Sequence, residues 1–113
     1  SAVEVAGLKV VASEMEGADR KALMETADQL KNKLGEGVVV LATVEDGKVV
    51  LVAGVTKSAT NRIKAGDLMK HLASLVDGKG GGRPDMAQGG GNDPSRLAEA
   101  LAGVPAWVEQ NIG

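Results

Sequence analysis

The spacing of hydrophobic residues changes along this 113-residue chain, and each change marks the start of a new predicted helix or strand. A β-branched run at residues 9–13 predicts a first strand. Apolar residues then recur at helical spacing between Asp19, a suitable N-cap, and Gly35, a suitable C-terminal stop. The pattern therefore predicts a strand followed by an amphipathic helix of about four turns.

A continuous apolar run at residues 38–44 predicts a second strand that is buried on both faces. The tight-turn sequence at residues 45–48 contains Asp46-Gly47, which favours a type I′ hairpin. Residues 49–55 then form the returning antiparallel strand. The first two strands flank a helix, so we expect them to be parallel with a right-handed crossover.

The C-terminal half predicts helices. Apolar residues at helical spacing indicate a helix over residues 65–77 that ends at Gly78. Asp93-Pro94 provides an N-cap and a first helical residue, and Gly103-Val104-Pro105 opens a last short helix. We therefore expect one domain, residues 1–113, of the small α/β class, with a mixed sheet packed by C-terminal helices. The first residue is not Met, which suggests a piece of a longer protein.

Seven of the sixteen glycines lie in residues 78–94, which we expect to form an irregular loop between two helices. Such a loop exposes backbone N–H groups, and Lys79 and Arg83 lie within it. Exposed N–H groups, cations and a following helix N-terminus suit the oxygens of a phosphate or sugar-phosphate. Loops of this length are uncommon unless they are functional or disordered, so a flexible loop without a ligand remains the alternative.

Charge is concentrated beside this loop. The whole chain carries −2, whereas residues 57–83 carry +4, from six cations and two carboxylates. Lys57, Arg62 and Lys64 follow the third predicted strand, and ligands of open α/β sheets tend to lie beyond strand ends. This cluster of cations would attract an anionic partner, although a solvent-exposed polar segment between a strand and a helix explains it equally well.

Composition excludes several classes of site. The chain has no cysteine and one histidine, His71, so it offers neither a thiolate site nor a zinc cluster of its own. Trp107 stands without Phe or Tyr, and we expect both His71 and Trp107 to be structural. No signal peptide or membrane-length apolar run is visible, which favours the cytoplasm. No catalytic constellation is apparent.

Two segments together carry a family resemblance: Lys64-Ala-Gly-Asp-Leu-Met69 and Gly80-Gly-Gly-Arg-Pro-Asp-Met-Ala-Gln88. Over nearly its whole length the chain resembles the C-terminal globular domain of bacterial alanyl-tRNA synthetase. That domain is a version of the DHH-associated (DHHA-type) domain of DHH phosphoesterases. In those enzymes the comparable glycines precede a histidine, whereas this chain has Arg83 and no Asp-His-His motif.

The resemblance implies a non-catalytic domain that grips the outer corner of the tRNA for alanine. It would help one tRNA reach both the aminoacylation and the editing centres of the ligase. It also implies that ATP and zinc act only in domains preceding this one, so no cofactor is expected here. Partners would be the tRNA and the other domains of the same ligase, with a homo-oligomer left open and no membrane.

Together the charge cluster and the resemblance predict a set of RNA-contacting residues. Glycine amides would contact phosphate and ribose, cations would extend the strip, and two amide side chains would bond to sugar or base edges. The predicted set is Lys57, Asn61, Arg62, Lys64, Lys79, Gly80, Gly81, Gly82, Arg83, Gln88, Gly89, Gly90 and the amide of Gly91. Two alternatives stay open, a structural or oligomerisation domain and an accessory domain of a DHH-type phosphoesterase.

Overall fold

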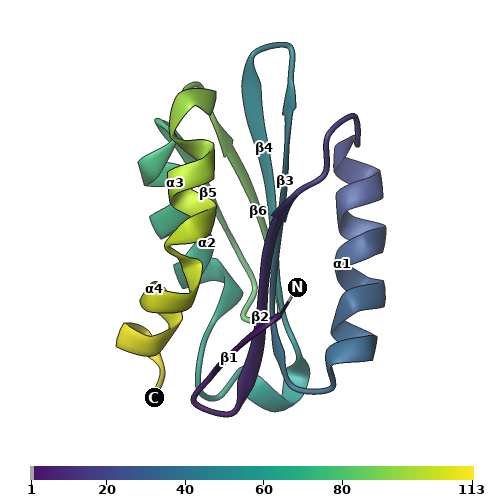
Figure 1. Cartoon of the computed structure of the whole chain (residues 1–113), viewed down its shortest axis with the longest axis vertical. Helices are drawn as coiled ribbons and strands as arrows, with labels where there is room; N and C mark the ends of the chain where they lie inside the picture. Colours follow the sequence, from purple (N-terminus) through teal and green to yellow (C-terminus); the bar gives the residue numbers. More distant parts are fainter. Residues whose placement is uncertain (1) are drawn as a thin grey trace.

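A six-stranded mixed sheet lies between one helix on one face and three helices on the other (Figure 1). The computed structural model describes residues 2–113. In chain order its elements are β1 (Val3–Val5), β2 (Leu8–Glu14), α1 (Arg20–Leu34), β3 (Gly37–Glu45), β4 (Lys48–Val55), the 3-10 turn η1 (Lys57–Ala59), α2 (Ala65–Leu75), β5 (Gly78–Gly82), β6 (Met86–Gly91), the 3-10 turn η2 (Pro94–Arg96), α3 (Leu97–Ala102) and α4 (Val104–Asn111).

The strand order is β1-β2-β3-β4-β6-β5, and only β2 and β3 are parallel. The predicted strand–helix–strand unit and the predicted mixed sheet are confirmed. The Asp19 side chain accepts a hydrogen bond from the Ala22 amide at 2.8 Å, which satisfies a free donor at the start of α1. Asp46 and Gly47 both have positive φ, 52° and 77°, as the type I′ turn between β3 and β4 requires.

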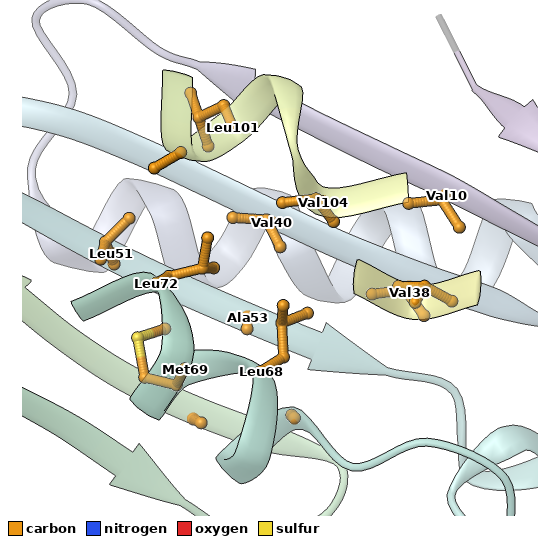
Figure 2. Close-up of a cluster of buried hydrophobic side chains, with 14 of the residues drawn as sticks. Val10, Val38, Val40, Leu51, Ala53, Leu68, Met69, Leu72, Leu101 and Val104 are labelled. Carbon is orange, nitrogen blue, oxygen red and sulfur yellow. The ribbon is translucent and has the colours of Figure 1, made fainter. Parts of the chain in front are cut away.

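Two apolar cores lie on opposite faces of the sheet. The larger is formed by alternate residues of β2, β3 and β4 with α2, α3 and α4, and Figure 2 shows its centre around Leu68, Met69 and Leu72 of α2. The smaller lies beneath α1, where Leu23 and Ala27 pack on residues of β3 and β4. Because α1 covers β3 and β4, strands β6 and β5 project beyond it.

The prediction of an irregular glycine-rich loop was wrong. Residues 78–82 and 86–91 are the antiparallel strands β5 and β6, and β6 pairs with β4. Glycine has a low strand propensity, but the packing here requires residues without a side chain. A Cβ atom on Gly80 or Gly89 would lie 2.7 or 2.8 Å from the Met69 side chain, so α2 can pack on the hairpin only because both are glycine.

Three smaller differences concern element ends. Strand β1 was not predicted, because three residues carry too little pattern. Helix α2 ends at Leu75, and Asp77, not Gly78, takes the left-handed conformation with φ 57°. Asp93-Pro94 starts the 3-10 turn η2, whose Ser95 amide is capped by the Asp93 carboxylate, and the regular helix α3 follows only at Leu97.

Candidate nucleic-acid interface

The hydrogen-bond phase of the β5–β6 hairpin decides which glycine amides remain free. At the turn the Arg83 amide donates to the Met86 carbonyl, and at the open end the Asn92 amide donates to the Asp77 carbonyl. Antiparallel pairs alternate, so Lys79 and Gly81 bond to β6, while Gly78, Gly80 and Gly82 direct their N–H and C=O groups outward. Strand β5 is the last strand of the sheet, so these groups lie along its edge. At Gly82 the edge packs against α2, because a Cβ on Gly66 would lie 2.8 Å from the Gly82 carbonyl oxygen.

Strand β6 has neighbours on both sides, so its amides are engaged in the sheet. The register with β4 pairs Leu51 with Gly89 and Val49 with Gly91, and Gly90 pairs with Lys79 of β5. Of the amides expected to contact an RNA backbone, those of Gly80 and Gly82 therefore lie outside the ladder. The other glycines of the predicted set have their amides bonded within the sheet, so an RNA backbone could contact only the surface of the sheet that these glycines form.

The side chains of β5 and β6 alternate between the two faces of the sheet. Gly80 and Gly89 face α2, as their proximity to Met69 shows. Their neighbours face the α1 side, where the two strands project beyond the helix: Lys79, Gly81, Gln88 and Gly90. A trough runs along this uncovered face between α1 and the edge strand. Its upper part, near Lys48 and Asn92, is a cavity of about 830 Å³. Its lower part, near the β5–β6 turn, is a cavity of about 260 Å³, and Gln88 lines both.

Cations surround the upper trough. Lys79 of β5 and Lys48 of β4 line it together with Arg20 of α1, and Asp77 is the carboxylate among its lining residues. The Arg20 guanidinium crosses from the helix to the strands, donating to the Gln88 side chain at 3.2 Å and to the Gly89 carbonyl at 3.3 Å. A longer bond of 3.5 Å reaches the Leu51 carbonyl. A half-buried guanidinium therefore sits over the glycine strand.

Sequence reasoning missed Arg20, because 68 positions separate it from Gln88. One local signal could have drawn attention to it. The first turn of α1 contains Arg20 and Lys21 and no acidic residue. Cations are disfavoured at the positive end of a helix dipole, so two of them in the first turn indicate a use that offsets this cost, such as binding an anion.

The structure divides the predicted basic strip. The Ala65 amide donates to the Pro84 carbonyl at 2.8 Å, which places the backbone next to Lys64 beside the β5–β6 turn. The Lys64 ammonium itself donates to the Thr60 carbonyl at 2.8 Å, and Lys64 lines one cavity with Asn61 and Arg62. Arg83 is 77% exposed and lies 3.6 Å from the Asp85 carboxylate. Arg83 thus lies at the turn of the hairpin, whereas the Lys64 side chain is directed to Thr60.

The remaining predicted residues lie elsewhere. Arg62 donates to the carbonyls of Ala6 and Gly113, so it ties the β1–β2 turn to the C-terminus. Asn61 lines a separate cavity beside Trp107 and is not brought to Gln88. Lys57 lines a third cavity with residues from the C-terminal end of α1. The structure therefore gathers Lys79, Gly81, Gln88 and Gly90 with Arg20, whereas Lys64 lies with Asn61 and Arg62.

The profile of the DHHA1 domain family matches residues 7–110. The chain belongs to this family. It is 59% identical over its whole length to an alanine–tRNA ligase of Xanthomonas campestris pv. campestris, and 60% identical over 98% of its length to that of Ralstonia nicotianae. It spans 13% of the length of each of these relatives. The resemblance stated from the sequence is thus confirmed.

The DHHA1 fold also matches a solved structure, the C-Ala domain from Aquifex aeolicus alanyl-tRNA synthetase. The TM-score is 0.89 at 27% identity, with 96% of this chain and 98% of that one covered. The predicted fold class is confirmed by this match. Among residues 2–113 no helix has the length and apolar content that crossing a bilayer requires. In the same part of the chain no three His, Cys, Asp or Glu side chains converge as a metal site.

His71 of α2 and Trp107 of α4 lie together on the face of the sheet that α2, α3 and α4 cover in this DHHA1 domain (Figure 1). Their rings are stacked, with centroids 5.7 Å apart and planes 23° from parallel. Trp107 is half-buried and packs against the larger core. The expected structural role fits this position, and the stacking partner of Trp107 is a histidine.

This stack predicts a pH dependence. Burial lowers the pKa of His71 below its ordinary value of 6.5, so the folded domain holds the proton less tightly than the unfolded chain. The contribution of neutral His71 to stability is therefore fully present above pH 6.5. It is expected to be lost as the pH falls through 6.5 toward the lower pKa of His71 in the folded domain. Thermal unfolding between pH 7.5 and 5.5 measures this, and His71→Gln should flatten the profile. An equal slope in both proteins would contradict it.

Proposed function

We propose that this DHHA1 domain is the non-catalytic, tRNA-binding C-terminal domain of an alanine–tRNA ligase. It would grip the outer corner of the tRNA for alanine and help one tRNA reach the aminoacylation and editing centres in the rest of the ligase. The alanine–tRNA ligases to which the chain is similar support this role. The observation that carries it is the cationic trough over a glycine strand, with Arg20, Lys48 and Lys79 around it.

The chemistry of the trough suits a sugar-phosphate backbone. Glycine strands present a surface without side chains, so a backbone can approach closely. Cations and peptide amides are the groups that bind phosphates without reading sequence. Binding should therefore follow the shape of the RNA, because the trough offers Gln88 and Asn92 as its uncharged hydrogen-bonding side chains.

Fluorescence anisotropy of labelled tRNA for alanine at several salt concentrations tests the proposal. If about three phosphates are neutralised, log affinity should fall against log salt with a slope of roughly −2 to −3. The double variant Lys79→Ala/Arg83→Ala should bind about tenfold more weakly and reduce the slope by about 1.5. A matched control is Lys9→Ala/Lys33→Ala, which removes two exposed cations that do not line the trough.

The two alternatives predict different results. A structural or oligomerisation domain would form a dimer in gel filtration and would not bind tRNA at high micromolar concentration. An accessory domain of a phosphoesterase would prefer short oligonucleotide ends to folded tRNA. Equal loss of affinity in the trough variant and in the control would show that charge alone attracts the RNA, and would remove the trough from the proposal.

A further inference from the structure

The lower part of the trough differs in chemistry from the upper part. Its cavity of about 260 Å³ is lined by two methionines, Met24 of α1 and Met86 of β6, together with Gly81, Gly82, Arg83 and Gln88. Resting on the proposed function, we propose that this cavity, the methionine seat, accepts one nucleobase of the bound RNA between the two thioethers. The size suits a single ring system, because pockets for whole drug-sized ligands start at about 300 Å³.

Two tethers hold the walls of the methionine seat in place. Arg20 of α1 bonds to Gln88 and Gly89 of β6, and Lys31 of the same helix donates to the Asp85 carbonyl at 3.2 Å. Met24 follows Arg20 by four residues, so the two side chains share one flank of α1. Met24 therefore lies between the tethers and opposite Met86. The helix and the hairpin cannot separate without breaking both sets of bonds.

The chain has no aromatic platform on this face. It contains no Phe or Tyr, and Trp107 is stacked on His71 on the other side of the sheet. Thioether sulfur is polarizable and makes favourable contacts with aromatic rings, so a methionine pair can substitute for an aromatic one. Met24 and Met86 are half-buried at the edge of the smaller core, which leaves part of each side chain open to a ligand.

The groups around the seat complement a nucleotide. The Gln88 amide lies between the two cavities, where it can donate to or accept from a base edge. The exposed Arg83 guanidinium lines the same cavity and can reach the phosphate of the same nucleotide. The space beside Gly81 is unfilled, since the nearest atom to a Cβ at this position would be Lys70 Cε at 3.8 Å. The RNA backbone on one side of this nucleotide would then lie in the upper trough.

The four methionines of the chain supply the test. Peroxide converts exposed methionine to sulfoxide, and mass spectrometry measures the rate at each residue with and without saturating tRNA for alanine. Bound tRNA is expected to slow oxidation of Met24 and Met86 at least about threefold. Met15 is the matched control, because it is half-buried and follows β2, on the other side of β3 and β4 from β6. Met69 is fully buried and should stay unreactive throughout.

Inorganic polyphosphate, which has phosphates but no bases, is the second probe. It should compete with tRNA for the cations and leave the oxidation rates of Met24 and Met86 unchanged. Equal protection by polyphosphate would overturn the proposal, because it would show occlusion without a base. Salt-sensitive tRNA binding with both methionines unprotected would overturn the seat and leave the proposed function standing. No tRNA binding at all would remove both.

A variant checks the same inference by filling the seat. Gly81 lines the lower trough and its backbone conformation suits any residue, so Gly81→Leu places a side chain in the cavity without backbone strain. It should fold with unchanged circular dichroism and bind tRNA about tenfold more weakly, which corresponds to roughly 1.4 kcal/mol. Unchanged affinity of the folded variant would show that no base enters the seat.

Discussion

Gly91→Ala is expected to destabilise the domain by about 3 kcal/mol, the upper range for overpacking a well-packed core. A Cβ on Gly91 would lie 2.1 Å from the Val76 carbonyl oxygen and 2.7 Å from Val76 Cγ2. That carbonyl cannot move aside, because it also accepts a hydrogen bond from the Asp93 amide at 2.9 Å. The added methyl group must therefore push the hairpin away from the end of α2.

The matched control for this experiment is Gly81→Ala in the same hairpin. Neither glycine has a positive φ, so the two substitutions differ in the space around the new methyl group. At Gly81 this space is open, and loss of chain entropy in the unfolded state should stabilise the domain by about 0.5 kcal/mol. Urea unfolding measures both, and an m-value near 2 kcal/mol/M would lower the midpoint for Gly91→Ala by about 1.5 M. Similar midpoints for the two variants would refute the close packing of β6 on α2.

A second pair of variants should change stability in opposite directions. Thr56 Oγ1 accepts a hydrogen bond from the Gly37 amide at 3.0 Å inside the protein, and Thr56 is 6% exposed. Thr56→Val keeps the shape and leaves that amide without a partner, which should cost about 2 kcal/mol. Thr43 is fully buried, and within residues 2–113 its hydroxyl has no hydrogen-bond partner. Thr43→Val should therefore stabilise the domain by about 1 kcal/mol.

The two substitutions are chemically identical, so the unfolded states change in nearly the same way. Any difference between them must come from the hydrogen bond that one hydroxyl makes and the other does not. Urea unfolding of both variants at pH 7.5, where His71 is neutral, isolates this difference. A loss of stability in Thr43→Val as large as that in Thr56→Val would show that the Thr43 hydroxyl is hydrogen-bonded after all.

The elements that the sequence predicted well are those with signals close together in the chain. Helix α1 is preceded by its capping residue Asp19 and followed by Gly35, both visible without tertiary information. The β3–β4 hairpin has an Asp46-Gly47 turn whose positive φ angles few other pairs adopt. The motif over residues 80–88 was specific enough to indicate the family, which residues 7–110 then matched.

Only part of the arrangement of the candidate interface could be anticipated from the sequence, for physical reasons. Lys79, Gln88 and the glycines lie in one segment of the sequence, but the sequence did not show that this segment folds as an edge hairpin. Arg20 was missed, because nothing near it in the chain indicates that it will cross to Gln88. Arg62 was assigned to the RNA strip, whereas it bonds to Ala6 and Gly113, contacts that depend on where the chain ends meet.

By itself, then, the sequence determined the caps of α1, the hairpin turn, the parallel strand pair and the family, because these depend on local conformational preference and on the spacing of apolar residues. Tertiary structure alone decided that the glycine segment is two strands. Glycine has almost no conformational preference of its own, so its state depends on the free edge of β4 and on the close approach of Met69. The same packing places α1 beside β6, and only then do Arg20, Met24 and Met86 become one trough.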